Sequence, residues 1–441
     1  MRADAMGGKE TGIMHFKDKD WRVHRIRSRI ARLLALPLLV LTLGACDSLL
    51  DVNVPGAVDA EELRNPQLAG SLLVAALGEV ECATAHYVDG TAILADEYIV
   101  SAFWRNFNIW GARLAELETW TGPCQSGLGA SNLGFYVALS RARFMTDDAF
   151  QRIDAFAEGE LSINKNASLA TLAAYSGYAH TMLGEGFCEM AIDGGPLMTR
   201  AQVFEAALEK FRTAEQLAQS AGDASIQNMS LVGQARILLN LGRATEAAAA
   251  ARRVPQGFVR NATFSTTDPR RHNRVAVNSH RNLFTSVSPR FRDLTIDGNQ
   301  DSRVGAIDTG RTGHDNLTPL FLQTKYPDFD SPIPLASWRE AQLIVAEAEL
   351  GQSAVDRINT LRDYHGLPRW EPTDVNDSQA ILAQVIEERR RELFLEGHRL
   401  NDKLRFGIPF PTGANHKGEP YGPVTCLPLP RIERDSNPNI A

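Results

Sequence analysis

The stretch Phe204-Glu205-Ala206-Ala207-Leu208-Glu209-Lys210-Phe211-Arg212-Thr213-Ala214-Glu215-Gln216-Leu217-Ala218 decides the fold class. Its apolar residues recur at intervals of three and four, which places them on one face of an α-helix. The run Ser220-Ala221-Gly222-Asp223 follows, and glycine at such a position is typical of a helix end. The sequence therefore predicts an amphipathic helix that packs one face against neighbouring elements.

The same spacing recurs along much of the chain. It is formed by Leu172, Tyr175, Ala179 and Met182, by Leu231, Ala235, Leu238 and Leu239, by the alanine-rich run 244–252, by Trp338, Ala341, Val345 and Ala348, and by Val355, Ile358 and Leu361. Pairs of short antiparallel helices with small residues at their contacts are similar to tetratricopeptide repeats. Because the period is irregular, we expect several divergent repeats within one mostly α-helical domain.

Residues 256–335 interrupt this pattern with a stretch rich in Asn, Asp, Arg, Ser and Pro. Loops of this length are usually functional or disordered. Short apolar segments at 292–296 and 320–323 predict ordered elements that lie on the helices. The tail from Gly407 onward is rich in Pro and Gly and is expected to be irregular.

The N-terminus has the features of an export signal that ends at Cys46. An arginine-rich segment precedes an apolar run of about 11 residues, and Leu43-Gly44-Ala45-Cys46 closes it. A helix that spans a membrane needs roughly 20 residues, so we expect residues 1–45 to be a cleaved signal peptide, with Met14 as an alternative start. The ending resembles a bacterial lipobox, which predicts a lipid on Cys46; the alternative is a lone cysteine without lipid. No second apolar run is expected to reach membrane length.

Composition narrows the class of protein further. The hydrophobic content of 44% and charged content of 22% are those of a globular protein, and the net charge of −7 disfavours nucleic acid as a partner. Four cysteines remain besides Cys46, and disulfides persist outside the cytosol. Three connectivities are open. We predict the pairs Cys82–Cys124 and Cys188–Cys426, with four buried free thiols as the alternative.

Four stretches, in order, resemble one known family. They are 48–56 with Asn65-Pro66, Pro334–Glu349 with the helix that contains Ile358-Asn359 and Leu361-Arg362, Glu387–Arg405, and Leu427-Pro428-Leu429-Pro430 with Glu433 and Asn437-Pro438-Asn439. Behind a lipobox, these stretches resemble the RagB/SusD family of outer-membrane nutrient-uptake lipoproteins. The resemblance covers nearly the whole mature chain but is poor in the middle region, where ligand specificity resides in this family.

The resemblance implies a fold, a location and partners. We expect one SusD-like unit over 46–441, divided into an N-terminal helical or lid region (46–160), repeat helices (161–255), the loop-rich insert (256–335), and C-terminal helices with an irregular tail (336–441). Family members sit on the outer membrane, facing the exterior, as a lid over a SusC-type TonB-dependent barrel. They capture oligosaccharides, or peptides in some members, without catalysis. No cofactor, metal or nucleic acid is implied.

An aromatic cluster with polar neighbours is the candidate ligand site. It comprises Phe103, Trp104, Asn106, Phe107 and Trp110. Sugar rings present C–H faces that stack on indole rings, while amides bond their hydroxyls. Trp104 and Trp110 are six residues apart, so one of them is free to be exposed; the alternative is a set of core aromatics. Tyr326, Trp370 and Tyr87 are further candidates, of which Tyr326 is included in the predicted site.

Other motifs favour structural roles. Asp297-Gly298-Asn299-Gln300-Asp301 resembles the start of a calcium loop, with Asp308 at the twelfth position, but Ser302 replaces the required glycine, so a polar turn is the better interpretation. Glu387–Arg405 is interpreted as a surface helix with i,i+4 ion pairs.

No HExxH, GxSxG or Walker motif occurs. The rival functions are a glycan-degrading lipoprotein, which needs two carboxylates in a cleft, and a structural repeat scaffold of the envelope.

Overall fold

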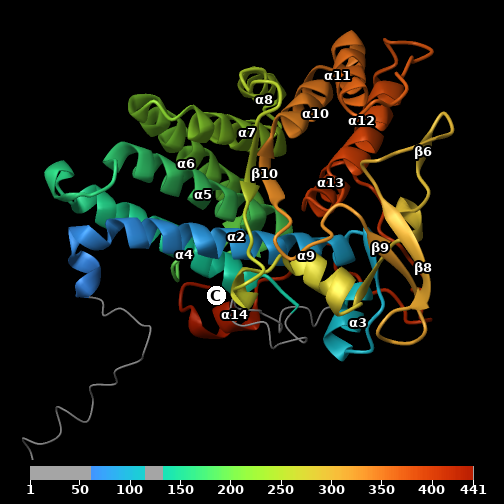
Figure 1. Cartoon of the computed structure of the whole chain (residues 1–441), viewed down its shortest axis with the longest axis horizontal. Helices are drawn as coiled ribbons and strands as arrows, with labels where there is room; N and C mark the ends of the chain where they lie inside the picture. The colour runs from blue at the N-terminus through green and yellow to red at the C-terminus, as the bar shows by residue number, and fades with distance from the viewer. Residues whose placement is uncertain (1–60, 115–132, 441) are drawn as a thin grey trace, which may run out of the picture. The chain divides into compact units, whose positions relative to one another are not determined.

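The computed structural model describes residues 61–114 and 133–440. The predicted signal peptide and lipidation site, and also Cys124, lie outside these residues. From Leu63 onward the chain forms one compact unit. Most of this unit is helical, as the sequence predicts (Figure 1).

Long helices pack against one another largely in chain order. Their bounds are α2 (Ala69–Leu94), α4 (Tyr136–Ala155), α5 (Lys165–Gly186), α6 (Arg200–Ala221), α7 (Ala224–Asn240), α8 (Ala244–Ala251), α10 (Trp338–Glu349), α11 (Gly351–Tyr364) and α12 (Ser378–Glu392). Each helix from α4 to α8 contacts the next, α8 contacts α10, and α10 and α11 each contact α12. Figure 1 shows α4 to α8 stacked one on another. This arrangement of neighbouring pairs fits the expected repeat pattern.

Helix α6 illustrates how the sequence specifies these elements. Thr199 caps its start by accepting a hydrogen bond from the Gln202 amide, and Gly222 ends it with a φ of 70°. The ring of Phe211 is buried between α5 and α7. A Cβ atom at Gly233 of α7 would lie only 2.4 Å from this ring. Glycine at position 233 therefore allows α6 and α7 to approach closely.

Helix α2 contradicts the expectation that no second apolar run reaches membrane length. It is long and apolar enough to cross a membrane by length and composition. However, it contacts α4, α5, α9 (Arg274–Ala276) and α13 (Arg399–Arg405), and its residues from Val80 to Leu94 are almost all buried. These contacts are those of a core helix, which requires the same apolar composition as a membrane span.

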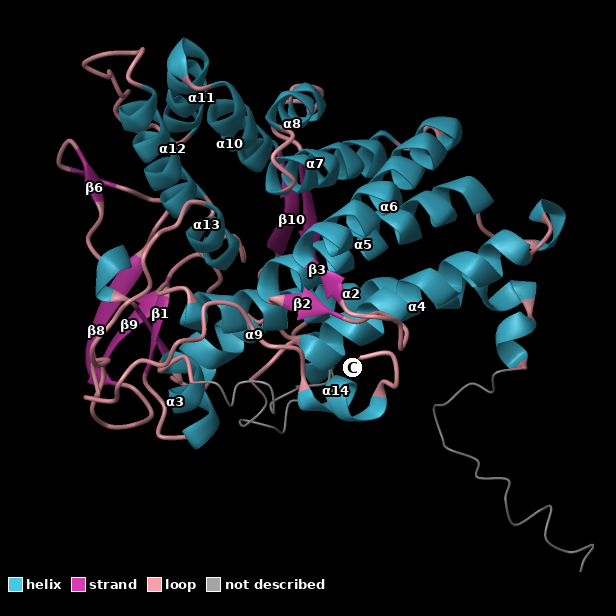
Figure 2. Cartoon of the chain, turned by 180° about the vertical axis from the view of Figure 1, so that it is seen from behind, coloured by secondary structure: helices cyan, strands magenta, loops and turns pink. Residues whose placement is uncertain are grey.

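The insert predicted to be loop-rich contains short strands. The strands of the unit are β1 (Tyr98–Val100), β2 (Glu189–Met190), β3 (Met198–Thr199), β4 (Val259–Ala262), β5 (Thr285–Val287), β6 (Thr295–Ile296), β7 (Asn299–Gln300), β8 (Ala306–Thr312), β9 (Pro319–Gln323) and β10 (Ile333–Ser337). They pair antiparallel as β1–β5, β4–β10, β2–β3, β6–β7 and β8–β9. Strand β5 also contacts β9, and Figure 2 shows β1, β8 and β9 at one end of the helical stack. The strands are too short for period-two alternation to reveal them in the sequence.

Shorter helical elements complete the unit. They are α3 (Arg105–Gly111), α9, α13, α14 (Arg431–Ser436), 3₁₀ turns at Glu62–Arg64, Pro66–Leu68, Glu158–Glu160, Pro269–Arg271 and Pro289–Phe291, and a π turn at Val277–Arg281.

The stretch Glu387–Arg405 is not one surface helix. Helix α12 ends at Glu392, the chain turns through Leu395 and Gly397 with positive φ angles, and α13 follows. The pair Glu387–Arg391 forms as expected, at 2.6 Å. Glu388 and Glu392, however, are buried and bind Arg303 of the insert. Glu388 and Glu392 of α12 thus face a buried cluster of ion pairs. The spacing of charged residues in the sequence does not distinguish such a cluster from a helix face exposed to solvent.

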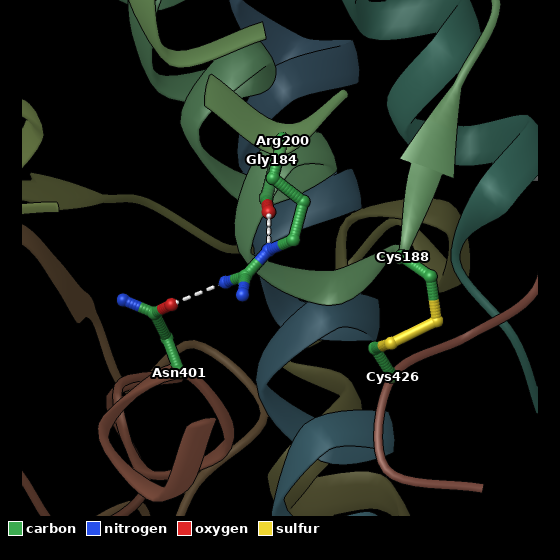
Figure 3. Close-up of a disulfide and its surroundings, with 5 residues drawn as sticks. All are labelled: Gly184, Cys188, Arg200, Asn401 and Cys426. Atoms are coloured by element: carbon green, nitrogen blue, oxygen red, sulfur yellow. Dashed lines mark hydrogen bonds between the residues drawn. A yellow bond between two sulfur atoms is a disulfide. The ribbon is translucent and has the colours of Figure 1, made fainter. Parts of the chain in front are cut away.

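A disulfide joins Cys188 to Cys426, the pair expected from the sequence, with a Cα–Cα distance of 5.2 Å (Figure 3). The disulfide follows α5 and joins this part of the chain to the C-terminal tail. Beside it, Arg200 donates hydrogen bonds to the carbonyl of Gly184 (2.7 Å) and to Asn401 Oδ1 (2.6 Å), which link α5, α6 and α13. Cys82 is also disulfide-bonded. Its pairing with Cys124 stays a prediction because Cys124 lies outside the described residues.

Candidate functional site

The predicted ligand residues separate into one exposed and three buried side chains. Trp104 is 39% exposed, whereas Trp110 is 1% exposed and Tyr326 2%. Trp110 packs edge-on against Phe135, and the Tyr326 hydroxyl donates a hydrogen bond to the carbonyl of Leu395. Asn106 is also buried. The side chains of Trp110, Tyr326 and Asn106 thus belong to the core, and their contact with a ligand stays a prediction.

The weaker candidates show the same division. Tyr87 is buried beside Phe135, at a ring-centroid distance of 5.1 Å. Trp370 is half-buried, and Asn359 holds its backbone through two hydrogen bonds. Neither residue lies in the aromatic group that Trp104 forms.

Trp104 is part of an exposed aromatic group that we term the aromatic shelf, made of Phe103, Trp104 and His314. Phe103 is 59% exposed and lies 4.8 Å from Trp104 between ring centroids. The imidazole of His314 is stacked on Phe103 at 4.3 Å and is nearly parallel to Trp104 at 6.0 Å. Phe103 and Trp104 thus present exposed aromatic surface, and His314 supports Phe103 as a half-buried stacking partner.

Buried aromatic rings support the shelf from beneath. His314 contacts Phe284 edge-on at 4.8 Å, and Phe284 contacts Phe107 at 5.0 Å. The amide of His314 donates to the carbonyl of Leu283 at 3.1 Å. Since aromatic pairs in such geometries stabilise one another, the shelf is held in a fixed orientation on the core.

A polar frame fixes the backbone on the Trp104 side. Lys417 Nζ donates to the carbonyl of Ala102 (2.6 Å) and to Asn108 Oδ1 (2.9 Å). Asn108 Nδ2 in turn donates to the carbonyls of Ala102 (3.2 Å) and Trp104 (3.1 Å), at the start of α3. The backbone of the segment that bears Phe103 and Trp104 is therefore defined by side chains far from it in sequence.

Asp315 fixes the loop that bears His314. It accepts hydrogen bonds from the amides of Leu317 and Thr318 and lies 2.8 Å from Lys417 Nζ. Burial alone would raise its pKa, but the bonds from Lys417 and Thr318 outweigh burial and lower the pKa to about 2. Asp315 is therefore ionised at neutral pH and joins the two segments of the shelf through Lys417.

We expect Gly313→Ala to lower the free energy of unfolding by about 1–3 kcal/mol, as overpacking does. A Cβ atom at Gly313 would lie 2.4 Å from Ser101 Cβ and 3.0 Å from the carbonyl oxygen of Leu283, so the His314 loop would have to move. Urea denaturation measures the change. Gly159→Ala is the matched control, because its Cβ would meet nothing within 4 Å. Equal stability of both variants would contradict the close packing of this loop.

Sequence reasoning missed His314, Asp315 and Lys417. They lie in the insert and in the irregular tail, more than 200 residues from Trp104, and no local pattern marks them. The prediction that the insert contributes to the ligand site remains a proposal, although it now has a specific residue, His314.

Comparisons with known proteins agree with this architecture. Residues 340–425 match the family model described as the SusD family. A SusD-like carbohydrate-binding protein from Bacteroides vulgatus ATCC 8482 superposes with a TM-score of 0.61 at 14% identity, over 84% of this chain and 96% of that one. A SusD superfamily protein from Parabacteroides distasonis ATCC 8503 has a TM-score of 0.63 at 14% identity, over 87% and 99%.

Surface glycan-binding protein A from Bacteroides thetaiotaomicron, solved in complex with laminarihexaose, has a TM-score of 0.59 at 13% identity, over 84% of this chain and 97% of that one. No curated protein matches the chain. The structure defines a SusD-like helical fold. The C-terminal part of the chain, residues 340–425, is similar in sequence to the SusD family.

Proposed function

We propose that the protein binds an oligosaccharide through the aromatic shelf. The observation that carries this proposal is that Phe103 and Trp104, adjacent in sequence and in ring contact, are both exposed on a support of buried aromatic rings. Exposed apolar ring surface suits the C–H faces of sugars. SusD-like proteins with glycan ligands share the fold, which supports the same interpretation.

Binding rather than catalysis fits the shelf. Glycoside hydrolysis needs two carboxyl groups about 5–10 Å apart, one of them with a raised pKa. Asp315, which joins the two segments of the shelf, instead has a lowered pKa and is held by Lys417 and by its own turn. We therefore favour a binding protein over a glycan-degrading enzyme.

The Trp104→Ala variant should bind its oligosaccharide at least about fivefold more weakly, because an aromatic contact contributes on the order of 1 kcal/mol beyond area burial. A glycan array that includes laminarihexaose identifies the ligand, and isothermal titration calorimetry measures the affinity. Phe144→Ala is the matched control, since Phe144 is exposed on α4 and lies outside the shelf. Wild-type affinity in Trp104→Ala would refute the shelf as the binding site.

The family resemblance extends the proposal to the cell envelope. A lipid on Cys46 would anchor the protein to the outer membrane, where it would face the exterior and deliver its ligand to a SusC-type TonB-dependent barrel. Several acyl chains are needed for a lasting anchor, and a lipobox cysteine can supply them. Replacing Cys46 with Ser should release the protein from the outer-membrane fraction in detergent partition. Retention of the variant there would contradict the lipid anchor.

A further inference from the structure

A cavity of about 280 Å³ lies next to the shelf segment and has no role in the function described above. It is enclosed by the end of α2, by β1, by the turn at 288–290 and by the tail segment 411–421. Val100 and His416 line it. Strand β1, which ends at Val100, continues into Phe103 and Trp104, and His416 precedes Lys417, which holds the backbone of the shelf. The cavity therefore shares one chain segment with the shelf and a second with the polar frame that supports it.

Arg113 contributes a buried cation to this cavity. Its guanidinium lies over the rings of Phe410 (5.1 Å) and Tyr421 (4.8 Å), and Nη2 donates to the carbonyl of Pro411. Nε has no hydrogen-bond partner, and within the described residues no carboxylate forms an ion pair with Arg113. Burial lowers the pKa of Arg113, but a guanidinium remains charged in proteins. The site thus holds a positive charge without a matching acid.

The backbone is built to keep Arg113 in place. Arg113 has a φ of 53°, which is unfavourable for a residue with a side chain. Gly422 approaches so closely that a Cβ there would lie 2.2 Å from the Arg113 carbonyl oxygen. Strain of this kind persists where the surroundings fix it and is frequent at ligand sites.

Positive charge exceeds negative charge around the cavity. Asp96 is the single carboxylate among the described lining residues, and Arg290 is a second lining guanidinium. Lys403 Nζ at 2.8 Å, Arg399 at 3.4 Å and Arg290 at 3.6 Å already neutralise Asp96. Three cations thus surround the single negative charge of Asp96. The guanidinium groups of Arg113 and Arg290 are therefore available to an anionic group.

We propose that this cavity binds the carboxylate of an acidic sugar, a uronic acid residue of a glycan held by the aromatic shelf. The proposal rests on the function assigned to the shelf and specifies its ligand class. A guanidinium presents N–H donors in a plane that matches a carboxylate, and such charge-assisted bonds are stronger than neutral ones. Tyr421 also lines the cavity and supplies a neutral hydroxyl for the sugar.

The test compares each uronic acid oligosaccharide of a glycan array with its carboxyl-reduced form, which differs only at the acidic group, and includes sulfated glycans as a third arm. The wild-type protein should bind at least one uronic acid oligosaccharide about tenfold or more tightly than its reduced form. Arg290→Gln and Arg113→Gln should abolish that preference. Arg212→Gln, an exposed arginine on α6 outside the cavity, should retain it. Arg290 is exposed, so its variant is not expected to unfold.

The outcomes separate the two proposals. Equal binding of every acidic glycan and its reduced form, or an acid preference that survives in Arg290→Gln, overturns the carboxylate site and leaves the shelf intact. A preference for sulfated over uronic acid glycans overturns the assignment to a carboxylate. If Trp104→Ala leaves all binding unchanged, the shelf proposal fails and this inference fails with it.

Discussion

Arg303→Met is expected to lower the free energy of unfolding by about 3–5 kcal/mol, because it removes the buried cation that Asp301, Glu388 and Glu392 share and leaves their negative charge only partly compensated. Arg303 is buried between β7 and β8. Its Nε and Nη2 donate to the two carboxylate oxygens of Asp301 at 2.9 and 2.8 Å, and Nη1 donates to Glu388 of α12 at 2.7 Å. This ionic contact joins the insert to the C-terminal helices. Urea denaturation measures the loss.

The matched control for Arg303 is Arg369→Met, which breaks the exposed pair Arg369–Asp363 at 2.6 Å. Exposed pairs contribute about 0–1 kcal/mol, so this variant should stay close to wild type. Adding Asp301→Asn to Arg303→Met should recover part of the lost stability, since it removes a buried carboxylate that then has only Arg391, at 3.2 Å, as an ion-pair partner. Similar losses in the two single variants would show that burial does not increase the contribution of the Arg303 ion pairs to the free energy of unfolding.

The effect of Arg303 should also depend on pH. Burial alone would raise the pKa of Asp301, but the hydrogen bonds from Arg303 outweigh burial and lower that pKa below 3.8. A carboxyl whose pKa is lowered by folding stabilises the native state above its unfolded pKa, and this contribution disappears as the pH falls through the folded value. The difference in stability between wild type and Arg303→Met should therefore be largest near neutral pH and shrink below about pH 4.

The sequence predicted the helices well because each buries one face against a neighbour. Phe204, Leu208 and Phe211 occupy the buried face of α6, and Gly222 ends the helix as expected. Such signals are local, with a period of 3.6 residues. The pairing of β1 with β5 of the insert joins residues nearly 190 positions apart and leaves little trace in composition.

Only one property of the candidate site could be predicted from the sequence, namely that one of its two tryptophans is exposed. The spacing of Trp104 and Trp110 indicated that one of them could face solvent, but not which one. Tyr326 shows the limit of composition: an aromatic residue in a polar segment is buried here because its hydroxyl reaches the carbonyl of Leu395. His314 lies in the loop between β8 and β9 and is placed on the shelf by hydrogen bonds to distant segments, from its own amide to the Leu283 carbonyl and from the Asp315 amide to the Ser101 carbonyl, for which a single sequence has no marker.

The double variant Cys188→Ser/Cys426→Ser is expected to lower the free energy of unfolding by about 2–5 kcal/mol. The bond closes a loop with a sequence separation of 238 residues, and in the chain-entropy model long loops give stabilisation near the upper end of this range. Backbone hydrogen bonds also join the two segments, from the Cys188 amide to the Leu427 carbonyl and from the Leu427 amide to the Gly186 carbonyl, both at 2.9 Å. We therefore expect the variant to fold but to be less stable.

The tail should respond most strongly to loss of this disulfide. Beyond Leu427, its described polar anchors include Tyr136 to Glu433 at 2.7 Å and Asn437 to the Gly195 carbonyl at 2.9 Å. Limited proteolysis should cut the tail of the double variant faster than that of the wild type. Because Cys82 is also disulfide-bonded, chemical reduction of the wild type acts on both bridges and should destabilise the protein at least as much as the double variant. Unchanged stability and proteolysis in the double variant would show that the noncovalent contacts alone hold the tail on α5.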